Sequence, residues 1–88
     1  MQFVLGVDIG TTGCKTVALD RAGHILAQGD SSYPVVSPRP GWGEQDPQAV
    51  LAGVWASMRE CLSRTTAAPA ALCIGGALHS LVAVDEHG

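Results

Sequence analysis

Basic residues are scarce in this 88-residue sequence, which has 5 of them against 8 acidic residues and a formal net charge of −3. No basic cluster is available to displace counterions from a phosphate backbone, so we expect no nucleic-acid partner. No apolar run approaches the roughly 20 residues that a membrane-spanning helix needs. The basic start of a signal peptide is missing too, and Asp8 places a carboxylate in the first apolar run. These absences predict a cytoplasmic protein with no membrane partner.

Cysteines and charged residues are also few. The three cysteines, Cys14, Cys61 and Cys73, lie far apart and form no C-x-x-C pair, which predicts neither a disulfide framework nor a zinc site. We expect all three to be small buried hydrophobic residues. With 47% hydrophobic and only 15% charged residues, the composition excludes a disordered chain and predicts a modest folded core.

The first third of the sequence has the pattern of three strands. The apolar run at residues 3–9 predicts a strand covered on both faces, and the Gly-Thr-Thr-Gly sequence at residues 10–13 ends it. Residues 14–19 and 24–29 predict two more strands, joined by a tight turn at residues 20–23. Strands joined by tight turns should be antiparallel.

Residues 31–45 contain three prolines and two glycines, so they form neither a central strand nor a helix. A loop of this length in a compact unit usually has a function or a surface to pack against. Its aromatic residues, Tyr33 and Trp42, predict that it packs against the protein.

A helix should follow, capped by Asp46 and with Pro47 at its first position. Its apolar residues recur with helical spacing, which predicts a core-facing stripe that includes Trp55 and Met58 and leaves Ser57 off it. The full stripe is Val50, Leu51, Val54, Trp55, Met58 and Leu62. The sequence at residues 65–69 closes the helix.

Two further strands are expected at residues 71–77 and 81–84, followed by a turn at residues 85–88 that repeats the Asp-x-x-Gly pattern of residues 20–23. A last strand and turn without a partner strand would leave an open sheet edge, which proteins normally cover. We therefore expect these residues to be the beginning of a larger protein.

The sharpest chemical signal lies at residues 6–13, Gly-Val-Asp-Ile-Gly-Thr-Thr-Gly. This sequence is not a dinucleotide-binding fingerprint, because it contains no G-x-G-x-x-G. It is not a Walker loop either, because Cys14 separates Gly13 from Lys15. Backbone amides and threonine hydroxyls in such a turn can bind an anion, and Asp8 could orient a hydrated Mg²⁺ that bridges phosphates. An ordinary hairpin turn that binds nothing is the other interpretation, and the residues alone leave both open.

Three motifs resemble a known family. Residues 6–12 resemble the first phosphate motif of the actin, Hsp70 and sugar-kinase superfamily. Residues 41–47, Gly-Trp-Gly-Glu-Gln-Asp-Pro, are similar to the G-W-x-E-Q-D-P segment of the FGGY carbohydrate kinases. Residues 75–85 resemble the strand and loop in which that family carries a Met-His pair. The three motifs occur in order over nearly the whole sequence, which is identified as an N-terminal fragment of a gluconokinase-like or xylulokinase-like member.

The resemblance implies an α/β, ribonuclease-H-like fold and an ATP-dependent kinase with a cleft between two such domains. Residues 1–88 would be the N-terminal part of the first domain, and the rest of the kinase is not covered. ATP and Mg²⁺ are the implied cofactors. Asp8 would be the catalytic residue, which acts with Mg²⁺ and the phosphates and holds the ion through water. The ATP-binding residues would be Gly10, Thr11, Thr12, Gly13 and Lys15.

The same resemblance implies that Leu78 and His79 contact a small carbohydrate, and it places Trp42 and Gln45 where they could wall or bind that ligand. Trp42 could equally well cover the hydrophobic core. Lys15 could equally well point to solvent, because side chains alternate along a strand. Leu78 replaces the common methionine, and Gly76 and Ala77 stand where xylulokinases have Gly-Gln. The run from His79 to Asp85 is closer to gluconokinases, which favours gluconate as the substrate, with xylulose next.

Two other functions remain open from the sequence. An ATPase of the actin or Hsp70 type would share the first motif but bind protein partners, and it has no reason to carry the other two motifs. In a non-catalytic β/α module, the glycine turn would only let the backbone reverse direction and would bind nothing. The oligomeric state is open, a homodimer included, and the catalytic base and adenosine site would lie beyond Gly88.

Overall fold

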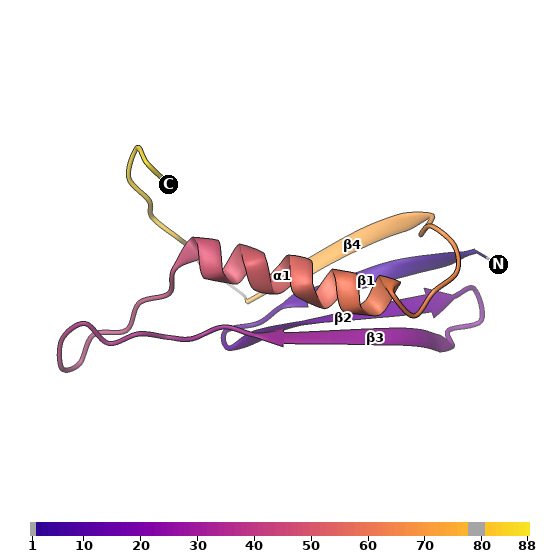
Figure 1. Cartoon of the computed structure of the whole chain (residues 1–88), viewed down its shortest axis with the longest axis horizontal. Coiled ribbons are helices and arrows are strands. Elements are labelled where there is room, and N and C mark those ends of the chain that lie inside the picture. Colours follow the sequence, from indigo (N-terminus) through magenta and orange to yellow (C-terminus); the bar gives the residue numbers. More distant parts are fainter. Residues whose placement is uncertain (1, 78–80) are drawn as a thin grey trace.

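The computed structural model describes residues 2–77 and 81–88, which form a mixed sheet with a helix against one face (Figure 1). The strands are β1 (Phe3–Ile9), β2 (Gly13–Asp20), β3 (Ile25–Ser32) and β4 (Ala71–Gly76), and the helix is α1 (Pro47–Leu62). The strand order is β3-β2-β1-β4. The β1–β2 and β2–β3 pairs are antiparallel, as predicted, and β4 lies parallel to β1. A parallel neighbour needs a long crossover connection, and α1 lies within it.

The core lies between α1 and the inner strands. Phe3, Leu5 and Val7 alternate along β1 with exposed or half-buried residues, so one face of β1 is apolar. Two clusters form on this face. The first holds Phe3, Leu5, Ala18, Ala27 and Cys61, and the second holds Val7, Cys14, Tyr33 and Val54. The predicted burial of Cys14 and Cys61 is confirmed.

The cap of α1 and the turn between β2 and β3 form as their sequences predict. The Asp46 carboxylate accepts a hydrogen bond from the backbone nitrogen of Gln48 at 2.9 Å, and Pro47 begins α1. In the turn between β2 and β3, the Asp20 carboxylate accepts from the backbone nitrogens of Ala22 and His24. The hydrogen bond from the His24 backbone is the main cause that lowers the pKa of Asp20. The strand after this turn runs on to Ser32, into the segment predicted as loop.

The face that α1 buries differs from the predicted stripe. Val54 is buried and Met58 packs against both clusters, as predicted, but Trp55 is 52% exposed and Leu51 is 49% exposed. Their places are taken by Gly53 and Ser57, which are buried. The prediction followed the largest apolar side chains, whereas the smallest residues let the helix approach the sheet closely.

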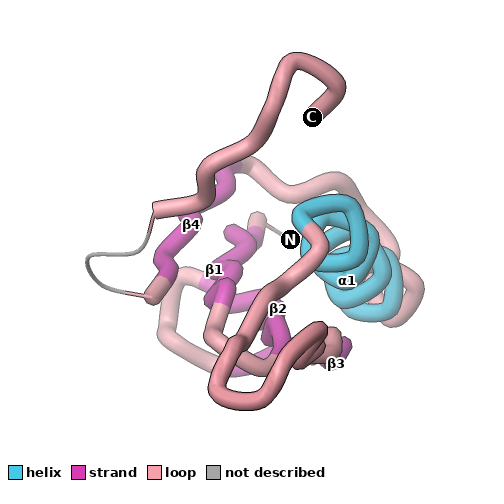
Figure 2. Tube along the Cα trace, turned by 90° about the vertical axis from the view of Figure 1, so that its left-hand side faces the viewer, coloured by secondary structure: helices cyan, strands magenta, loops and turns pink. Residues whose placement is uncertain are grey.

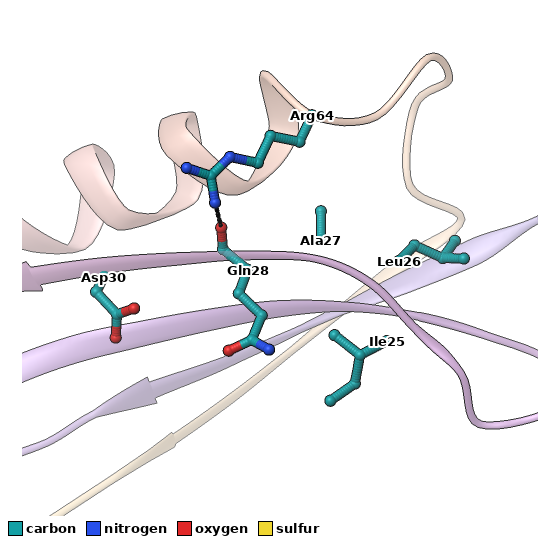
Figure 3. A pocket seen from close by; sticks show the side chains of 6 residues that line it. All are labelled: Ile25, Leu26, Ala27, Gln28, Asp30 and Arg64. Carbon is teal, nitrogen blue, oxygen red and sulfur yellow. Dashed lines mark hydrogen bonds between the residues drawn. The ribbon is translucent and has the colours of Figure 1, made fainter.

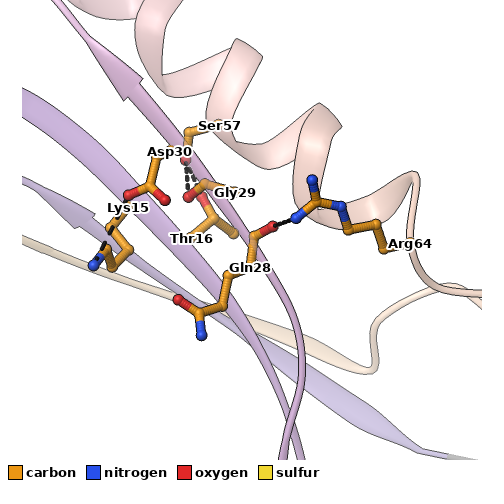
Figure 4. Close-up of polar contacts among 7 residues, drawn as sticks. All are labelled: Lys15, Thr16, Gln28, Gly29, Asp30, Ser57 and Arg64. Atoms are coloured by element: carbon orange, nitrogen blue, oxygen red, sulfur yellow. Dashed lines mark hydrogen bonds and ion pairs between the residues drawn. The ribbon is translucent and has the colours of Figure 1, made fainter.

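The closest approach of helix and sheet is at Gly29 in β3. A Cβ atom at Gly29 would collide with the Ser57 carbonyl oxygen and would lie 2.7 Å from the backbone nitrogen of Cys61. Beside it, the hydroxyls of Thr16 and Ser57 form a hydrogen bond of 2.5 Å, and both residues are fully buried (Figure 4). The Ser57 hydroxyl also lies 3.5 Å from the Gly29 carbonyl oxygen. This polar pair joins β2 and β3 to α1 inside an apolar core.

Replacing Ser57 with alanine should destabilise the protein by about 1–3 kcal/mol, because it leaves the buried Thr16 hydroxyl without a partner. Thermal or denaturant unfolding of the intact protein measures the loss. Thr16→Val combined with Ser57→Ala should cost less than the sum of the two single changes, since neither partner is then left behind. Additive losses would show that the two hydroxyls do not depend on each other.

Two predictions at the C-terminal end are wrong. Residues 81–84 form no strand, and Cys73 is exposed. A short apolar run makes a strand only where a neighbouring strand supplies hydrogen bonds, and no described strand lies beside residues 81–84. Cys73 is exposed because β4 is an outer strand, and α1 packs mainly over β2 and β3. The turn at residues 85–88 is present, with the Gly88 backbone nitrogen donating to the Asp85 carbonyl oxygen at 3.1 Å.

Within residues 2–77 and 81–88, no helix is long and apolar enough to cross a membrane. The segment between β3 and α1 projects past the end of the sheet, and a backbone bridge between Val36 and Glu44 ties its two arms together (Figure 1).

Candidate functional site

One end of the sheet gathers segments that are far apart in the sequence. The turn after β1, the loop after β3 and the N-terminus of α1 all lie at this end, which faces the viewer in Figure 2. The predicted phosphate-binding turn and Gln45 therefore belong to one region of the molecule, whereas Trp42 lies in the part of the loop that projects past the sheet (Figure 1).

Asp8 is exposed on the sheet face opposite α1, one residue before β1 ends. In the register of the sheet it lies between Lys15 on β2 and Gly75 on β4. Gly75 has open space where a Cβ atom would stand, so nothing in the described chain crowds that side of the carboxylate. No described residue forms a salt bridge with Asp8, because the Lys15 ammonium is instead 3.9 Å from the Asp30 carboxylate (Figure 4).

The turn at residues 10–13 is held by its carbonyl oxygens. The Tyr33 hydroxyl donates to the Gly10 carbonyl at 2.5 Å, and the Gln45 side-chain amide donates to the Thr11 carbonyl at 2.6 Å. The Tyr33 backbone nitrogen donates to the Thr12 carbonyl at 3.1 Å. Thr11 and Thr12 are exposed, and their own N–H groups donate to no acceptor in the described part of the chain.

Exposed threonines in a turn that closely follows an exposed carboxylate fit a particular chemistry. Successive N–H groups in a turn bind anions such as phosphate, and the Thr11 and Thr12 hydroxyls add donors. The residues therefore fit the terminal phosphates of ATP. The Asp8 carboxylate supplies the oxygen atoms that Mg²⁺ prefers, and an exposed carboxylate can hold the ion through its bound water.

The predicted carbohydrate contacts are only partly described. Trp42 is 52% exposed, and the Arg39 guanidinium lies 5.0 Å from the centre of its ring, so it does not cover the core. Gln45 is half-buried and lines a shallow depression, beside the Thr11 carbonyl that it contacts. The remaining walls of this depression are Val36, Glu44, Asp46, Pro47, Ala83, Val84, Asp85 and Gly88. Leu78 and His79 lie outside the described residues.

A second shallow depression lies along the outer edge of β3 (Figure 3). Ile25, Leu26 and Asp30 contribute to its walls, and the Arg64 guanidinium donates to the Gln28 carbonyl at 2.9 Å. This hydrogen bond satisfies an outward-facing carbonyl of the edge strand. The depression contains none of the predicted site residues.

The sequence predicts no role in the site for Tyr33, Gly53 or Asp30. Tyr33 was expected only to pack against the protein, which it does at 5% exposure, and its hydroxyl contact with the turn was not expected. The one available signal was a tyrosine, an aromatic ring with a hydrogen-bonding group, in a loop rich in proline.

Comparison with known families finds one match over nearly the whole chain. Residues 3–88 match the N-terminal domain of the FGGY family of carbohydrate kinases. A glycerol kinase of Stenotrophomonas maltophilia (strain K279a) is 40% identical over 63 residues, which are 72% of this chain and 13% of that kinase. A xylulose kinase of Staphylococcus xylosus is 29% identical over 89 residues, covering 100% of this chain and 18% of the relative. The chain thus spans less than a fifth of the length of these two relatives.

Solved structures show the same likeness. A xylulose kinase from Rhodospirillum rubrum superposes with a TM-score of 0.86 at 28% identity, over 99% of this chain and 18% of that one. A gluconate kinase from Lactobacillus acidophilus gives a TM-score of 0.81 at 26% identity, over 89% of this chain and 16% of that one. The predicted α/β class, with the ribonuclease-H-like fold of the actin and Hsp70 superfamily, is confirmed.

Proposed function

Because the chain belongs to the FGGY family of carbohydrate kinases, we propose that the intact protein transfers the terminal phosphoryl group of ATP to a hydroxyl of a small carbohydrate. The observation that carries this proposal is that the N–H groups of Thr11 and Thr12 donate to no acceptor among the described residues, in the turn that follows the strand of the exposed Asp8. Phosphoryl transfer depends mainly on positioning and on neutralising charge, and these groups are suited to both.

In the proposed site, Thr11 and Thr12 bind the terminal phosphates through their amides and hydroxyls. Gly10 and Gly13 keep side chains out of the way, so that phosphate can reach the backbone. A side chain at Gly13 would also be obstructed by the Ser31 carbonyl oxygen, 2.5 Å from its Cβ position. The Lys15 ammonium contributes positive charge on the same strand pair, although Asp30 offsets part of it.

Asp8 is the proposed magnesium-directing residue. Its carboxylate would accept hydrogen bonds from water bound to Mg²⁺ and so fix the ion relative to the turn. Mg²⁺ held in this way would neutralise part of the negative charge on the phosphates. The phosphates do not touch Asp8 itself, since like charges repel.

The carbohydrate is proposed to lie against Leu78, His79 and Trp42, with Gln45 close by. A histidine can donate to one hydroxyl and accept from another, which suits a polyol or sugar acid. Gluconate is the favoured substrate and xylulose the next, and the relatives named gluconate and xylulose kinases support including both. The identity to glycerol kinases adds glycerol to the substrates to be tested. Use of ATP suits the cytoplasm as the proposed compartment.

The test is a measurement of ADP release by the intact protein with MgATP and gluconate, xylulose or glycerol in turn. We expect one of the three to raise ADP release at least about tenfold over MgATP alone, because closure around the acceptor normally excludes water from such sites. The phosphorylated product should be identified by mass.

Two outcomes would contradict the proposal. ADP release that no carbohydrate changes would favour an ATPase of the actin or Hsp70 type. A failure to bind nucleotide at all, measured by calorimetry with MgATP, would favour a non-catalytic module whose glycine turn has only a backbone role.

A further inference from the structure

The turn after β1 has an unusual set of partners. Three successive carbonyls, those of Gly10, Thr11 and Thr12, accept hydrogen bonds, and all three donors belong to Tyr33 or Gln45. Both donors lie in the one segment that joins β3 to α1. The turn therefore has its carbonyl oxygens directed toward that segment.

The direction of the carbonyls fixes the direction of the amides. In a trans peptide the C=O group and the following N–H group point to opposite sides, and the described chain has no cis peptide. The three engaged carbonyls share peptide units with the N–H groups of Thr11, Thr12 and Gly13. These N–H groups therefore point away from Tyr33 and Gln45, which explains why those of Thr11 and Thr12 meet no acceptor in the described part of the chain.

We propose that Tyr33 and Gln45 are positioning residues that turn the amides of residues 11–13 toward the phosphates of the nucleotide. This inference rests on the proposed kinase function and assigns Gln45 to the nucleotide side of the reaction. Neither side chain touches the phosphates. Each acts through a carbonyl of the turn, so that the amides need no reorganisation when an anion binds.

Tyr33 is itself held in place by α1. Its ring is buried, and a Cβ atom at Gly53 would lie 2.7 Å from the Tyr33 Cδ2 atom, so only glycine leaves room for the ring there. Burial is the main cause that raises the pKa of the Tyr33 phenol, with further contributions from Cys14 and Asp8. The raised pKa keeps the hydroxyl protonated, and able to donate to Gly10, up to a higher pH than an ordinary phenol. The helix thus fixes the position of the Tyr33 ring, and the Tyr33 hydroxyl fixes the orientation of the first peptide unit of the turn.

Gln45 makes the second link to the same helix. It immediately precedes Asp46, whose carboxylate caps α1, and so its backbone is fixed by the start of the helix. From this position the side-chain amide reaches the Thr11 carbonyl, 34 residues away in sequence. The two positioning residues approach the turn from the two ends of one loop.

The test compares Tyr33→Phe and Gln45→Leu in the intact protein. Each variant removes one hydrogen bond to the turn and keeps most of the side-chain volume. Thr65→Val is the matched control, because it also removes a hydroxyl that donates to a backbone carbonyl in a half-buried position, at 3.0 Å from Leu62, but at the far end of α1. The readouts are the Kd of a non-hydrolysable MgATP analogue by calorimetry, the KM for ATP and for the carbohydrate, and the melting temperature.

We expect each of the two variants to weaken analogue binding and raise the KM for ATP by about fivefold to tenfold, which is the usual effect of one lost hydrogen bond. The KM for the carbohydrate should stay within about twofold, and Thr65→Val should leave all three constants unchanged. Amide hydrogen exchange should also show that the analogue protects residues 10–13 less in the two variants than in the parent protein.

Other outcomes would overturn the inference. A raised KM for the carbohydrate with unchanged analogue binding would place Gln45 in the carbohydrate site, and unchanged constants in both variants would leave the turn self-sufficient. If Tyr33→Phe fails to fold, Gln45→Leu decides the question alone. A parent protein that binds no analogue would remove the proposed kinase function itself, which separates that failure from a failure of the positioning role.

Discussion

Replacing Asp8 with alanine should lower kcat of the intact protein by about 100-fold or more, close to 3 kcal/mol of activation free energy. The Asp8 carboxylate is exposed and free of salt bridges to described residues, so its charge is available to the proposed Mg²⁺ and its water. Losing it leaves the transferred phosphoryl group without a fixed counter-charge. Asp8→Asn should lose nearly as much, because the amide keeps the shape but not the charge. Steady-state measurements of ADP release at saturating ATP and carbohydrate give the ratio.

Glu60→Ala is a suitable control for the Asp8 variants. Glu60 is an exposed carboxylate on α1 whose partner is Arg64, at 3.5 Å, so its loss removes the same charge from a region outside the proposed site. Its activity should stay within about twofold of the parent, as for most surface substitutions. A kcat for Asp8→Ala within about threefold of the parent, well under 1 kcal/mol, would remove Asp8 from the mechanism.

Gly29→Ala should be the most destabilising single-methyl change in the described chain, with a loss of about 3 kcal/mol or more. The added methyl group would meet the backbone of α1 at Ser57 and Cys61. Backbone atoms in a helix cannot rotate away as a side chain would, so α1 must lift off β3. Lifting the helix would also break the Thr16–Ser57 hydrogen bond and open the first apolar cluster.

Gly43→Ala provides the comparison for this change. A Cβ atom there would be 3.6 Å from a Val35 methyl group, which is ordinary van der Waals contact. We expect a stability change within about 0.5 kcal/mol, or a small gain from the reduced freedom of the unfolded chain. Circular dichroism during thermal unfolding of both variants measures the difference. Equal melting temperatures for the two would show that α1 can shift away from Gly29 at little cost.

Elements whose signals are local were predictable from the sequence. The strands at residues 3–9 and 14–19, the Asp20 turn and the Asp46 cap depend on residues a few positions apart, and each forms as expected. The predicted cover on both faces of the first strand is wrong, because Val4 and Asp8 are exposed on the face opposite α1. The face of α1 was less predictable. Hydrophobic spacing identifies large apolar residues, but the helix approaches β3 most closely at Ser57, opposite Gly29. Which face of the helix is buried depends on the residues of the partner strand, and the spacing of residues within the helix carries no information about that strand.

The candidate site divides in the same way. Asp8 and the Gly-Thr-Thr-Gly turn could be predicted as candidate site residues, because their carboxylate, amide and hydroxyl groups belong to residues that are close together in the sequence. The contacts from Tyr33 and Gln45 join positions 23 and 34 residues apart, and no periodic pattern links such positions. The exposure of Cys73 was missed for a similar reason, since an apolar run does not reveal that its strand is an outer one.

The parallel pairing of β1 and β4 has a consequence for how two reactants would meet. Ile9 lies opposite Gly76, and the Ala77 backbone nitrogen donates to the Ile9 carbonyl at 3.1 Å, so the two strands finish level with each other. In sheets of this kind, ligands sit beyond the carboxyl ends of neighbouring parallel strands. The turn after β1, proposed to bind ATP, and the chain after β4, proposed to bind the carbohydrate, would then begin one strand spacing apart, about 4.8 Å. A slip of β4 by a single residue would offset them by about 3.3 Å, so in the proposed reaction the register of β1 and β4 would align the phosphoryl donor with its acceptor.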